Sequence, residues 1–411
     1  MGEWKECKLG DVAGVQNGYA FKSDAFNDCD GIPVVKIKNV ASGKLDMRDV
    51  KYYQLSIKGL ENFLLNKNDI LITMTGSHIH QPSSIVGKVA RYNIKQKALL
   101  NQRVGKVYSL NDRKLNEDYL YHFLSQEDVT YELALNAGGS ANQANISPDL
   151  IKSLNFLLPP LPEQKTIAGI LSSLDDKIDL LHRQNKTLEA MAEVMFRQWF
   201  VEPCVNGLPD GWVETKLYDI CSVITKGTTP TTLGNQFVDS GINFIKVESI
   251  TDEGEFLPEK FAKISSETHN ILKRSIIKSN DVLCSIAGTI GRIAIVNESI
   301  LPANTNQAIA ILRVDEGKCF NEFIYLFLKS KLFQEAMEGK IVHAVQPNLS
   351  LGEIGNSIIF IPSQEELQDF KELIAPTFLG KKANQHQIRI LEKIRGTLLP
   401  KLMSGEVRVT I

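Results

Sequence analysis

Long apolar runs and paired cysteines are both missing from this chain of 411 residues. No stretch approaches eighteen consecutive apolar residues, and the N-terminal segment MGEWKECKLGDV lacks the apolar core of a signal peptide. We therefore expect a cytoplasmic protein without a membrane span. The six cysteines form no C-x-x-C motif and no cluster with histidine at zinc-ligand spacing, so we expect reduced structural thiols and no metal site. The His78-Ile79-His80 pair, with no acidic or cysteine ligand nearby, is more typical of a loop.

Motifs for chemistry on nucleotides are missing as well. The chain has no G-x-x-x-x-G-K-[ST] phosphate loop. It also has neither the glycine-rich cofactor loop nor the Asn/Asp-Pro-Pro-aromatic motif that an adenine methyltransferase would need. No set of carboxylates and lysines at nuclease spacing, and no Ser/His/Asp or Cys/His set, stands out from chance. We therefore expect a protein without catalysis of its own and without a bound cofactor.

Neither positive nor negative charge is in clear excess. The net charge is −2, and by segment it is +2 over residues 1–158 and −4 over residues 205–361. A protein that holds nucleic acid mainly by bulk electrostatics would need a clear basic excess. We therefore expect this chain alone to bind nucleic acid poorly.

What the chain does contain is an internal repeat, which is the first feature to establish because it determines the whole fold. Trp4-Lys5-Glu6-Cys7-Lys8-Leu9-Gly10-Asp11-Val12 matches Trp212-Val213-Glu214-Thr215-Lys216-Leu217-Tyr218-Asp219-Ile220. GIPVVKIKNV from Gly31 matches GINFIKVESI from Gly241, and NDILITMTGS from Asn68 matches NDVLCSIAGT from Asn280. Each copy alternates short β-branched runs with one helical stretch, EDYLYHFLSQEDVTYELAL or NEFIYLFLKSKLFQEAMEG, which predicts a compact α+β domain.

A long helix is expected after each copy. Pro159, Pro160 and Pro162 end the preceding strand, and a helix from Pro162 to Phe200 would be roughly 58 Å long. Its apolar positions recur at the spacing of a coiled-coil seam: Ile167, Leu171, Leu174, Ile178, Leu181, Asn185, Leu188, Ala192, Met195 and Trp199. The second helix has a looser seam, with kinks expected at Pro376 and Gly380: Leu367, Phe370, Ile374, Asn384, Ile388, Leu391, Leu398 and Leu402.

The two helices are each other's nearest candidate partners, and they can pair antiparallel with pseudo-twofold symmetry. Asn185 interrupts the apolar seam, and a buried polar residue there would fix the register. We expect it to lie near the polar stretch of the second seam around Asn384, whereas a position on the solvent face would contradict this hypothesis. The expected organisation is two tandem α+β domains, residues 1–158 and 205–361, each followed by a helical coiled-coil region, residues 159–204 and 362–411.

Over its full length the chain resembles the specificity subunit of type I restriction-modification enzymes. The resemblance rests on the tandem repeat together with LPPLPEQKTIAGIL, MAEVMFRQWFV, LPDGWVETKL and LLPKLMSGEVRV, in this order. It implies that each globular unit is a target recognition domain that reads one half of a split, asymmetric double-stranded DNA site. It further implies that the helices dock two methyltransferase subunits, which would carry S-adenosylmethionine, and through them the restriction subunits.

Polar residues in the loops that flank the strands are the candidates for contact with DNA, because base edges are read by polar side chains and phosphates by Lys and Arg. In the first domain they are Tyr19, Lys22, Lys36, Lys38, Asn39, Thr75, Ser77, His78, Lys88, Gln102, Arg103, Ser140 and Gln143. In the second they are Lys226, Thr228, Thr229, Lys246, Glu248, Ser249, Thr289, Arg292, Asn306, Gln307, His343 and Gln346. A solvated turn is the alternative at every position.

Two other functions compete with a DNA-reading subunit. A self-contained restriction enzyme is disfavoured because the repeat and the helices leave no room for catalytic domains. S-adenosylmethionine binding by the isolated chain would favour it. A coiled-coil adaptor without a role on DNA would show no sequence-dependent DNA binding together with a methyltransferase.

Overall fold

The computed structural model describes residues 3–40, 43–54, 57–79, 85–140, 143–341 and 348–410. The chain forms two compact units: Met1–Leu180 with Gln387–Ile411, and Leu181–His386. The long helices α4 (Leu161–Phe196) and α10 (Gln364–Ser404) each contribute to both units. The units thus divide each helix near its middle instead of at its ends, because the core of each α+β domain includes residues of both helices. Among the described residues, no helix has the length and apolar content needed to cross a membrane.

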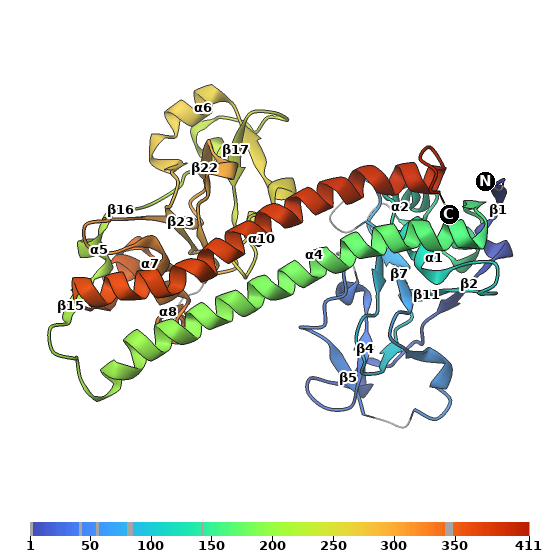
Figure 1. Ribbon diagram of the computed structural model, residues 1–411, viewed down its shortest axis with the longest axis horizontal. Coiled ribbons are helices and arrows are strands. Elements are labelled where there is room, and N and C mark those ends of the chain that lie inside the picture. Colours follow the sequence, from blue (N-terminus) through green and yellow to red (C-terminus); the bar gives the residue numbers. More distant parts are fainter. Residues whose placement is uncertain are drawn as a thin grey trace. The chain divides into compact units, whose positions relative to one another are not determined.

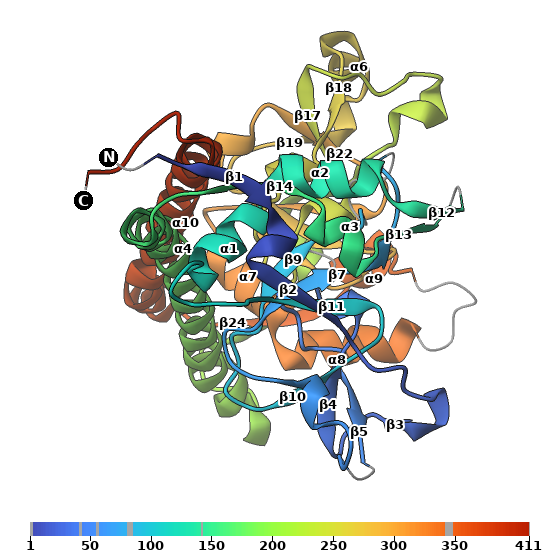
Figure 2. The same ribbon diagram turned by 90° about the vertical axis from the view of Figure 1, so that its right-hand side faces the viewer.

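The first unit contains two main sheets, and short helices cover the one that includes β7 and β11 (Figures 1 and 2). Its elements before α4 are β1 (Lys5–Lys8), β2 (Ala13–Asn17), β3 (Phe26–Asn27), β4 (Ile32–Val35), β5 (Lys51–Tyr53), β6 (Leu64–Leu65), β7 (Ile70–Thr73), β8 (Thr75–Gly76), β9 (Val89–Arg91), β10 (Ala98–Leu100), β11 (Val104–Ser109), α1 (Glu117–Leu124), α2 (Glu127–Leu135), β12 (Gly138–Ser140), β13 (Gln143–Asn145), α3 (Pro148–Lys152) and β14 (Asn155–Leu158).

The second unit follows a similar order, without strands corresponding to β3, β8, β12 and β13 among its described residues. Its elements are β15 (Val213–Lys216), α5 (Leu217–Ile220), β16 (Cys221–Lys226), β17 (Ile242–Ile245), β18 (Ala262–Ile264), α6 (Ser266–Ile271), β19 (Ile276–Ile277), β20 (Val282–Ser285), β21 (Ile293–Ile295), β22 (Ala303–Thr305), β23 (Ile309–Val314), α7 (Asn321–Lys329), α8 (Lys331–Ile341), α9 (Leu351–Gly355) and β24 (Ile358–Ile361).

The two main sheets have the same strand order in both units, as the sequence repeat predicts, with β3 as an additional edge strand in the first. One antiparallel sheet has the order β2-β11-β7-β9 in the first unit and β16-β23-β20-β21 in the second. In the other sheet, β4 pairs parallel with β10 and β17 pairs parallel with β22. β1 pairs with β14, and β15 with β24, so the start of each domain lies beside the strand that precedes its long helix. The predicted α+β class and tandem arrangement are confirmed.

The helical stretch expected in each domain is two helices instead of one. α1 and α2 are separated at Ser125, and α7 and α8 at Ser330. The Ser125 hydroxyl donates to the carbonyl of Tyr121 at 2.7 Å, and the Ser330 hydroxyl donates to that of Phe327 at 2.6 Å. A serine hydroxyl competes with the backbone for carbonyl oxygens and so favours the end of a helix. Apolar periodicity continues across each break, which explains why the sequence predicts one helix.

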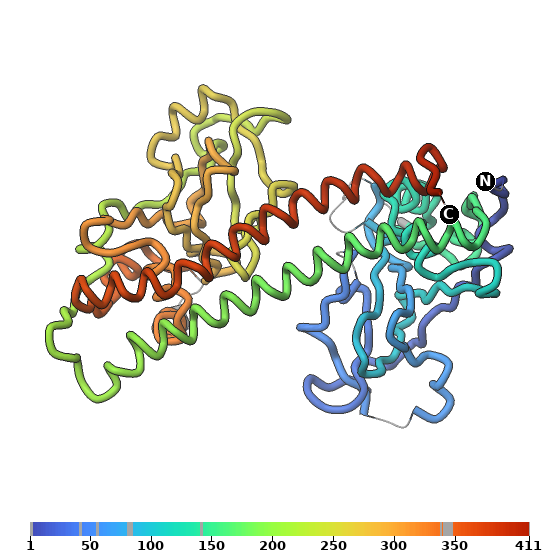
Figure 3. Tube along the Cα trace, in the orientation of Figure 1, coloured from blue at the N-terminus to red at the C-terminus, as the bar shows by residue number. Residues whose placement is uncertain are grey.

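The two long helices run antiparallel within each unit. In the first unit, Arg395 of α10 pairs with Asp175 of α4 at 2.5 Å, and Arg408, beyond α10, pairs with Glu163 at 2.6 Å. Residues further along α4 therefore pair with residues earlier in the C-terminal segment, as antiparallel helices require. In the second unit Lys381 pairs with Glu189 at 2.6 Å. The tube in Figure 3 shows both helices without interruption, and α10 stays helical through Pro376 and Gly380.

Glu163 in the first turn of α4 forms hydrogen bonds with both Trp4 and Arg408. The Glu163 side chain is only 1% exposed and accepts hydrogen bonds from the Trp4 indole Nε1 at 3.0 Å and from Arg408 Nε and Nη2 at 2.6 and 2.9 Å. The Arg408 guanidinium also lies over the Trp4 ring, 5.1 Å from its centre. We call Trp4, Glu163 and Arg408 the terminal latch. The second unit has the first part of it, since Trp212 Nε1 donates to Glu366 at 3.1 Å.

The seam of the helix pair also packs against the α+β domains. Ile167 and Leu171 of α4 share one core with Tyr119 and Phe156 of the first domain and with Leu402 of α10. The buried seam positions are Ile167, Leu171, Ile178, Leu181, Asn185, Ala192, Leu367, Phe370, Ile374, Ile388 and Leu402. The partly buried ones are Leu174, Leu188, Met195, Asn384, Leu391 and Leu398, while Trp199 is 37% exposed.

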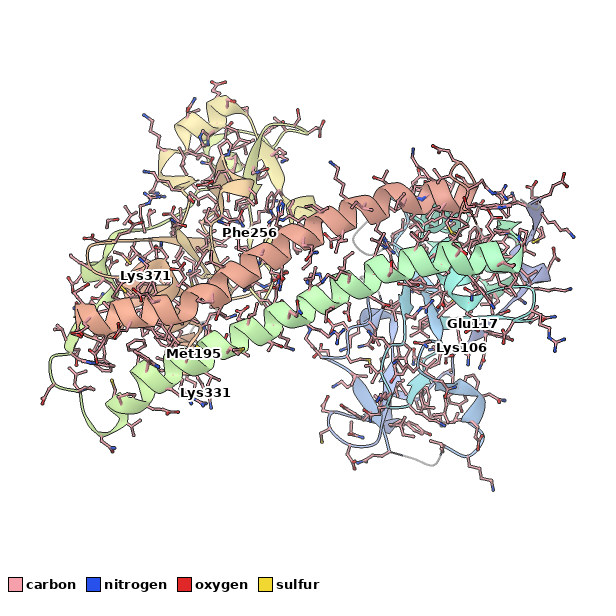
Figure 4. All side chains as sticks on the ribbon, viewed as in Figure 1. Lys106, Glu117, Met195, Phe256, Lys331 and Lys371 are labelled. Carbon is pink, nitrogen blue, oxygen red and sulfur yellow. The ribbon has the colours of Figure 1, made fainter. Side chains whose placement is uncertain are left out.

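Asn185 is buried and does not lie on the solvent face of the helix pair. Its side chain is 3% exposed, and Nδ2 donates to Glu255 Oε1 at 3.3 Å, in the loop before Phe256. Gln385 of α10 reaches the same oxygen at 3.5 Å. Figure 4, which labels Phe256, shows the side chains of this loop beside α10. Asn185 thus connects the helix pair to the second domain through a carboxylate that heptad spacing cannot reveal, and it shares this carboxylate with Gln385, the neighbour of Asn384.

Candidate nucleic-acid interface

The loop after β2 is fixed to the end of β10 in the first unit. Gly18 lies so close to the carbonyl of Asn101 that a Cβ would collide with it. The backbone N–H of Tyr19 donates to Leu100 O at 2.8 Å, and that of Gln102 donates to Tyr19 O at 2.9 Å. These contacts hold Tyr19 at the surface, where its side chain is 41% exposed. Gln102 and Lys22 beside it are exposed as well.

An aromatic cluster supports Tyr19 from below. Its members are Tyr19, Phe21, Phe26, Tyr53 and Phe63. The Tyr19 ring lies 4.9 Å from Phe21 and 5.3 Å from Phe63, at inclined angles that aromatic pairs favour. Ring packing of this kind fixes a surface side chain at a small entropic cost, so Tyr19 presents a rigid apolar surface.

Polar residues take the place of this cluster in the second unit. Gly227 after β16 lies against the carbonyl of Thr305, as Gly18 does against Asn101. The Thr229 hydroxyl donates to Gln307 Oε1, and Arg274 Nη2 donates to Thr228 Oγ1 at 3.1 Å. We call Thr228, Thr229, Arg274 and Gln307 the polar cluster. It brings together three residues predicted from the sequence and one, Arg274, that was not.

A lysine beside an aromatic ring occurs at the same place in both units. Lys36 Nζ lies 3.4 Å from the centre of the Phe26 ring, and Lys246 Nζ lies 4.7 Å from that of Phe237. Burial lowers the pKa of Lys36, and the charges of Lys38 and Lys51 lower it further. Both lysines are half-buried.

Four predicted contact residues do not present their side chains to solvent. Asn39 and Ser249 are 2% and 0% exposed, because each accepts a hydrogen bond from the backbone N–H of the lysine three residues earlier. Thr75 and Ser77 are 6% and 7% exposed. The Thr75 hydroxyl donates to Asn145 Oδ1 at 2.8 Å. All four side chains are thus buried within the domain, and their contact with DNA stays a prediction.

Arg103 and Arg292 are both held by neighbouring groups. Arg103 Nη1 lies 3.4 Å from Thr75 Oγ1 and 3.4 Å from Asn145 Oδ1. Arg292 Nε donates to Asp252 Oδ1 at 2.8 Å, and its Nη1 donates to the carbonyl of Val247 at 3.1 Å. Arg103 thus contacts only neutral groups here and its side chain is exposed. The Arg292 guanidinium, in contrast, is already paired with a carboxylate of its own domain.

The other predicted contact residues differ in their exposure. Lys38, which pairs with Asp49 at 3.1 Å, is exposed, as are Gln143 on β13, Glu248 and Thr289. Half-buried positions are His78, Lys88, Lys226 and Asn306. The backbone of Ser140 belongs to β12. His343 and Gln346 lie outside the described residues.

Arg274 and the aromatic partners of Tyr19 are the residues that sequence reasoning missed. Arg274 stands six positions before Asn280, and Asn62 stands six positions before Asn68 in the other copy. Extending the NDILITM and NDVLCSI alignment backward would have shown this change from Asn to Arg. The contacts of Phe63 and Tyr53 with the Tyr19 loop depend on how the strands pair and have no signal in the sequence.

The comparisons with known proteins agree with this architecture. The family described as "Type I restriction modification DNA specificity domain" matches residues 1–190 and 209–393. The chain is 28% identical to the type I restriction enzyme EcoBI specificity subunit of Escherichia coli, over 98% of this chain and 86% of that protein. It is 30% identical to the MjaIX specificity subunit of Methanocaldococcus jannaschii, over 71% and 69%. With the HindI specificity subunit of Haemophilus influenzae it shares 24% identity, over 99% and 100%.

A solved structure has the same fold. The S subunit of a type I restriction-modification system from M. genitalium superposes with a TM-score of 0.54 at 16% identity, covering 99% of this chain and 97% of that one. The named relatives are specificity subunits of type I restriction enzymes. Because the family match includes both α+β domains and most of both long helices, this chain belongs to the type I restriction-modification DNA specificity family.

Proposed function

We propose that the chain reads a split, asymmetric DNA site, one half-site with each unit, and docks two methyltransferase subunits that carry S-adenosylmethionine and recruit the restriction subunits. One observation carries the proposal. The two units share a topology, yet at the same place after β2 and β16 one presents the aromatic cluster and the other the polar cluster. Two domains of one fold with different surface chemistry are suited to two different half-sites.

Mapping of methylated adenines tests this proposal. The chain would be expressed with its methyltransferase subunit in cells that lack other adenine methylation, and modified positions would be mapped across the genome. We expect one motif with two different half-sites and a spacer of fixed length. A continuous motif, or no motif above background, would contradict the proposal. Methylation in cells without the chain serves as the control.

The long helices would set the distance between the half-sites. Two half-sites one helical turn of DNA apart are separated by about 34 Å. A helix of 36 residues such as α4 extends over about 54 Å, which is long enough to hold two reading domains at such a distance.

A matched insertion in both helices tests this role. Adding seven residues after Leu180 of α4 and seven after His386 of α10 keeps the heptad phase and lengthens both helices by about 10.5 Å. At 3.4 Å per base pair, we expect the spacer to grow by about three base pairs with unchanged half-sites. Methylation mapping reads both out, and an insertion in α4 alone is the control. Changed half-site bases with an unchanged spacer would exclude the role.

Exposed apolar residues at matching positions of α4 and α10 support the docking of two copies of one partner. Ile170 follows Glu163 by seven residues, and Leu373 follows Glu366 by seven. They are 37% and 41% exposed. Met191 and Ile394, each twenty-eight residues after the same glutamates, are 45% and 40% exposed. A single exposed apolar side chain is common on protein surfaces, so it is the recurrence at the same positions of both copies that supports a repeated contact with a partner.

Single charge substitutions should remove the partners one at a time. With Ile170→Glu or Leu373→Glu we expect one methyltransferase subunit per chain in place of two, and none with both substitutions. The mass of the purified complex, measured by native mass spectrometry, checks this. Lys186→Glu at another exposed position on α4 is the control for the change in charge. Retention of two subunits by the double variant would place the docking surface elsewhere.

A further inference from the structure

Three segments meet at the same place in both units. In the first unit they are the loop after β2, the turn after β10 and the 3-10 turn η4 (Glu61–Phe63) before β6. In the second unit they are the loop after β16, the turn after β22 and the 3-10 turn η11 (Lys273–Ser275) before β19. In the first unit the Tyr19 ring contacts Phe63 of η4, and in the second Thr228 contacts Arg274 of η11. The same junction is therefore apolar in one domain and polar in the other.

Backbone features fix the correspondence of these positions independently of side-chain similarity. Asn68 and Asn280 both have a positive φ, 80° and 68°. The aspartate that follows each of them accepts a hydrogen bond from the backbone N–H three residues earlier, at 2.9 and 2.8 Å. Counting back six residues from each asparagine gives Asn62 and Arg274, the middle residues of η4 and η11.

Arg274 differs from the other arginines of its domain in what it contacts. Arg292 pairs with Asp252, and Arg313 forms a bidentate pair with Asp281 at 2.7 Å. No carboxylate among the described residues pairs with Arg274, which is exposed and donates one of its five N–H groups to the Thr228 hydroxyl. In a domain with a net charge of −4, this side chain is held by a neutral partner at the surface.

We propose that Arg274 determines specificity in the second unit by donating two hydrogen bonds to a guanine in the second half-site. The proposal rests on the function proposed above. One N–H bond to Thr228 restrains the guanidinium, and four N–H groups remain for a ligand. Arginine paired with guanine O6 and N7 is the most common base-specific contact in protein–DNA complexes. Thr229 and Gln307 lie beside it as neutral hydrogen-bonding groups that suit a base edge.

A phosphate contact is the main competing role, and the neighbouring lysine provides the comparison. Lys273 is also exposed and belongs to the same 3-10 turn. A residue that binds phosphate weakens binding to all sequences by a similar factor, whereas a residue that binds a base changes discrimination at one position. Lysine at position 274 keeps the charge but loses the planar fork that binds guanine. Asparagine at position 274 is the residue that the first unit has at the corresponding position, Asn62.

The experiment maps methylated adenines for the wild-type chain and for Arg274→Asn, Arg274→Lys, Lys273→Ala and Tyr19→Ala, each expressed with the methyltransferase subunit. For both Arg274 variants we expect discrimination at one guanine-containing base pair of one half-site to fall about tenfold to a hundredfold. The other half-site and the spacer should stay the same. Lys273→Ala should lower methylation evenly at all sites, and Tyr19→Ala should change only the opposite half-site.

Three results would overturn the proposal for Arg274. One is an even loss of methylation at all sites for Arg274→Asn, which indicates a phosphate contact. Another is an unchanged motif, and the third is a change in the same half-site that Tyr19→Ala affects. If the wild-type chain directs no split motif, the proposed function fails and this proposal fails with it. A split wild-type motif with an unaltered Arg274→Asn motif contradicts the role of Arg274 alone.

Discussion

Replacing Glu189 with alanine should lower the free energy of unfolding of the second unit by about 3–5 kcal/mol. The Glu189 side chain is 8% exposed and accepts hydrogen bonds from Tyr325 Oη at 2.6 Å and Lys381 Nζ at 2.6 Å, and it pairs with Lys329. The substitution leaves two ammonium groups, 12% and 16% exposed, without their shared carboxylate. An uncompensated buried charge is the reason for the large loss.

Glu193 provides the matched control one turn further along α4. It lies 3.5 Å from the same Lys329 but is 42% exposed. An exposed ion pair contributes about 0–1 kcal/mol, so Glu193→Ala should have a small effect. The free energy of unfolding of both variants would be measured by urea titration, with hydrogen exchange of amides in the second unit as the probe. Equal losses for the two would show that burial of Glu189 is not the source of its contribution.

Below pH 6.5 the first unit should lose stability because of His122, by about 2 kcal/mol at pH 5. Burial, together with the charges of Arg91 and Arg395, lowers the pKa of His122 from 6.5 to about 3. The folded state therefore keeps the ring neutral while the unfolded state takes up a proton. Stability is fully present above pH 6.5 and falls progressively as the pH decreases toward the folded pKa. The ring is 1% exposed, and its Nε2 lies 3.0 Å from Ser172 Oγ of α4.

The repeat supplies the variant that tests this pH dependence. His122 corresponds to Leu326 in the second unit, which is 1% exposed. His122→Leu should therefore remove the loss between pH 6.5 and 5, as measured by thermal unfolding and by amide exchange in the first unit. Burial raises the pKa of Asp175, which lies 3.9 Å from the histidine, so this carboxyl acts in the opposite direction at the acid end of the range. An unchanged pH profile in His122→Leu would assign the loss to other groups.

Residue spacing predicts the fold of this chain well, but it does not predict which side chains lie at the surface. Seam positions such as Ile167 and Leu171 repeat at a heptad interval, and the two copies align over most strands, so the tandem α+β domains and the antiparallel helices follow from the sequence. A candidate contact residue depends instead on where one side chain points. Asn39 and Ser249 are polar loop residues by sequence, yet the backbone turn makes them internal caps. Asn185 finds Glu255 because two distant segments fold together.

The terminal latch affects the order in which the chain can fold during synthesis. The first unit needs residues 387–411, since Arg408 binds Glu163 and Val409 belongs to the core of this unit. The second unit is continuous from Leu181 to His386. Domains generally fold as the ribosome releases them, so we expect the unit that is synthesised first to complete its core last. Removal of residues 387–411 would accordingly damage the first unit and leave the second one intact.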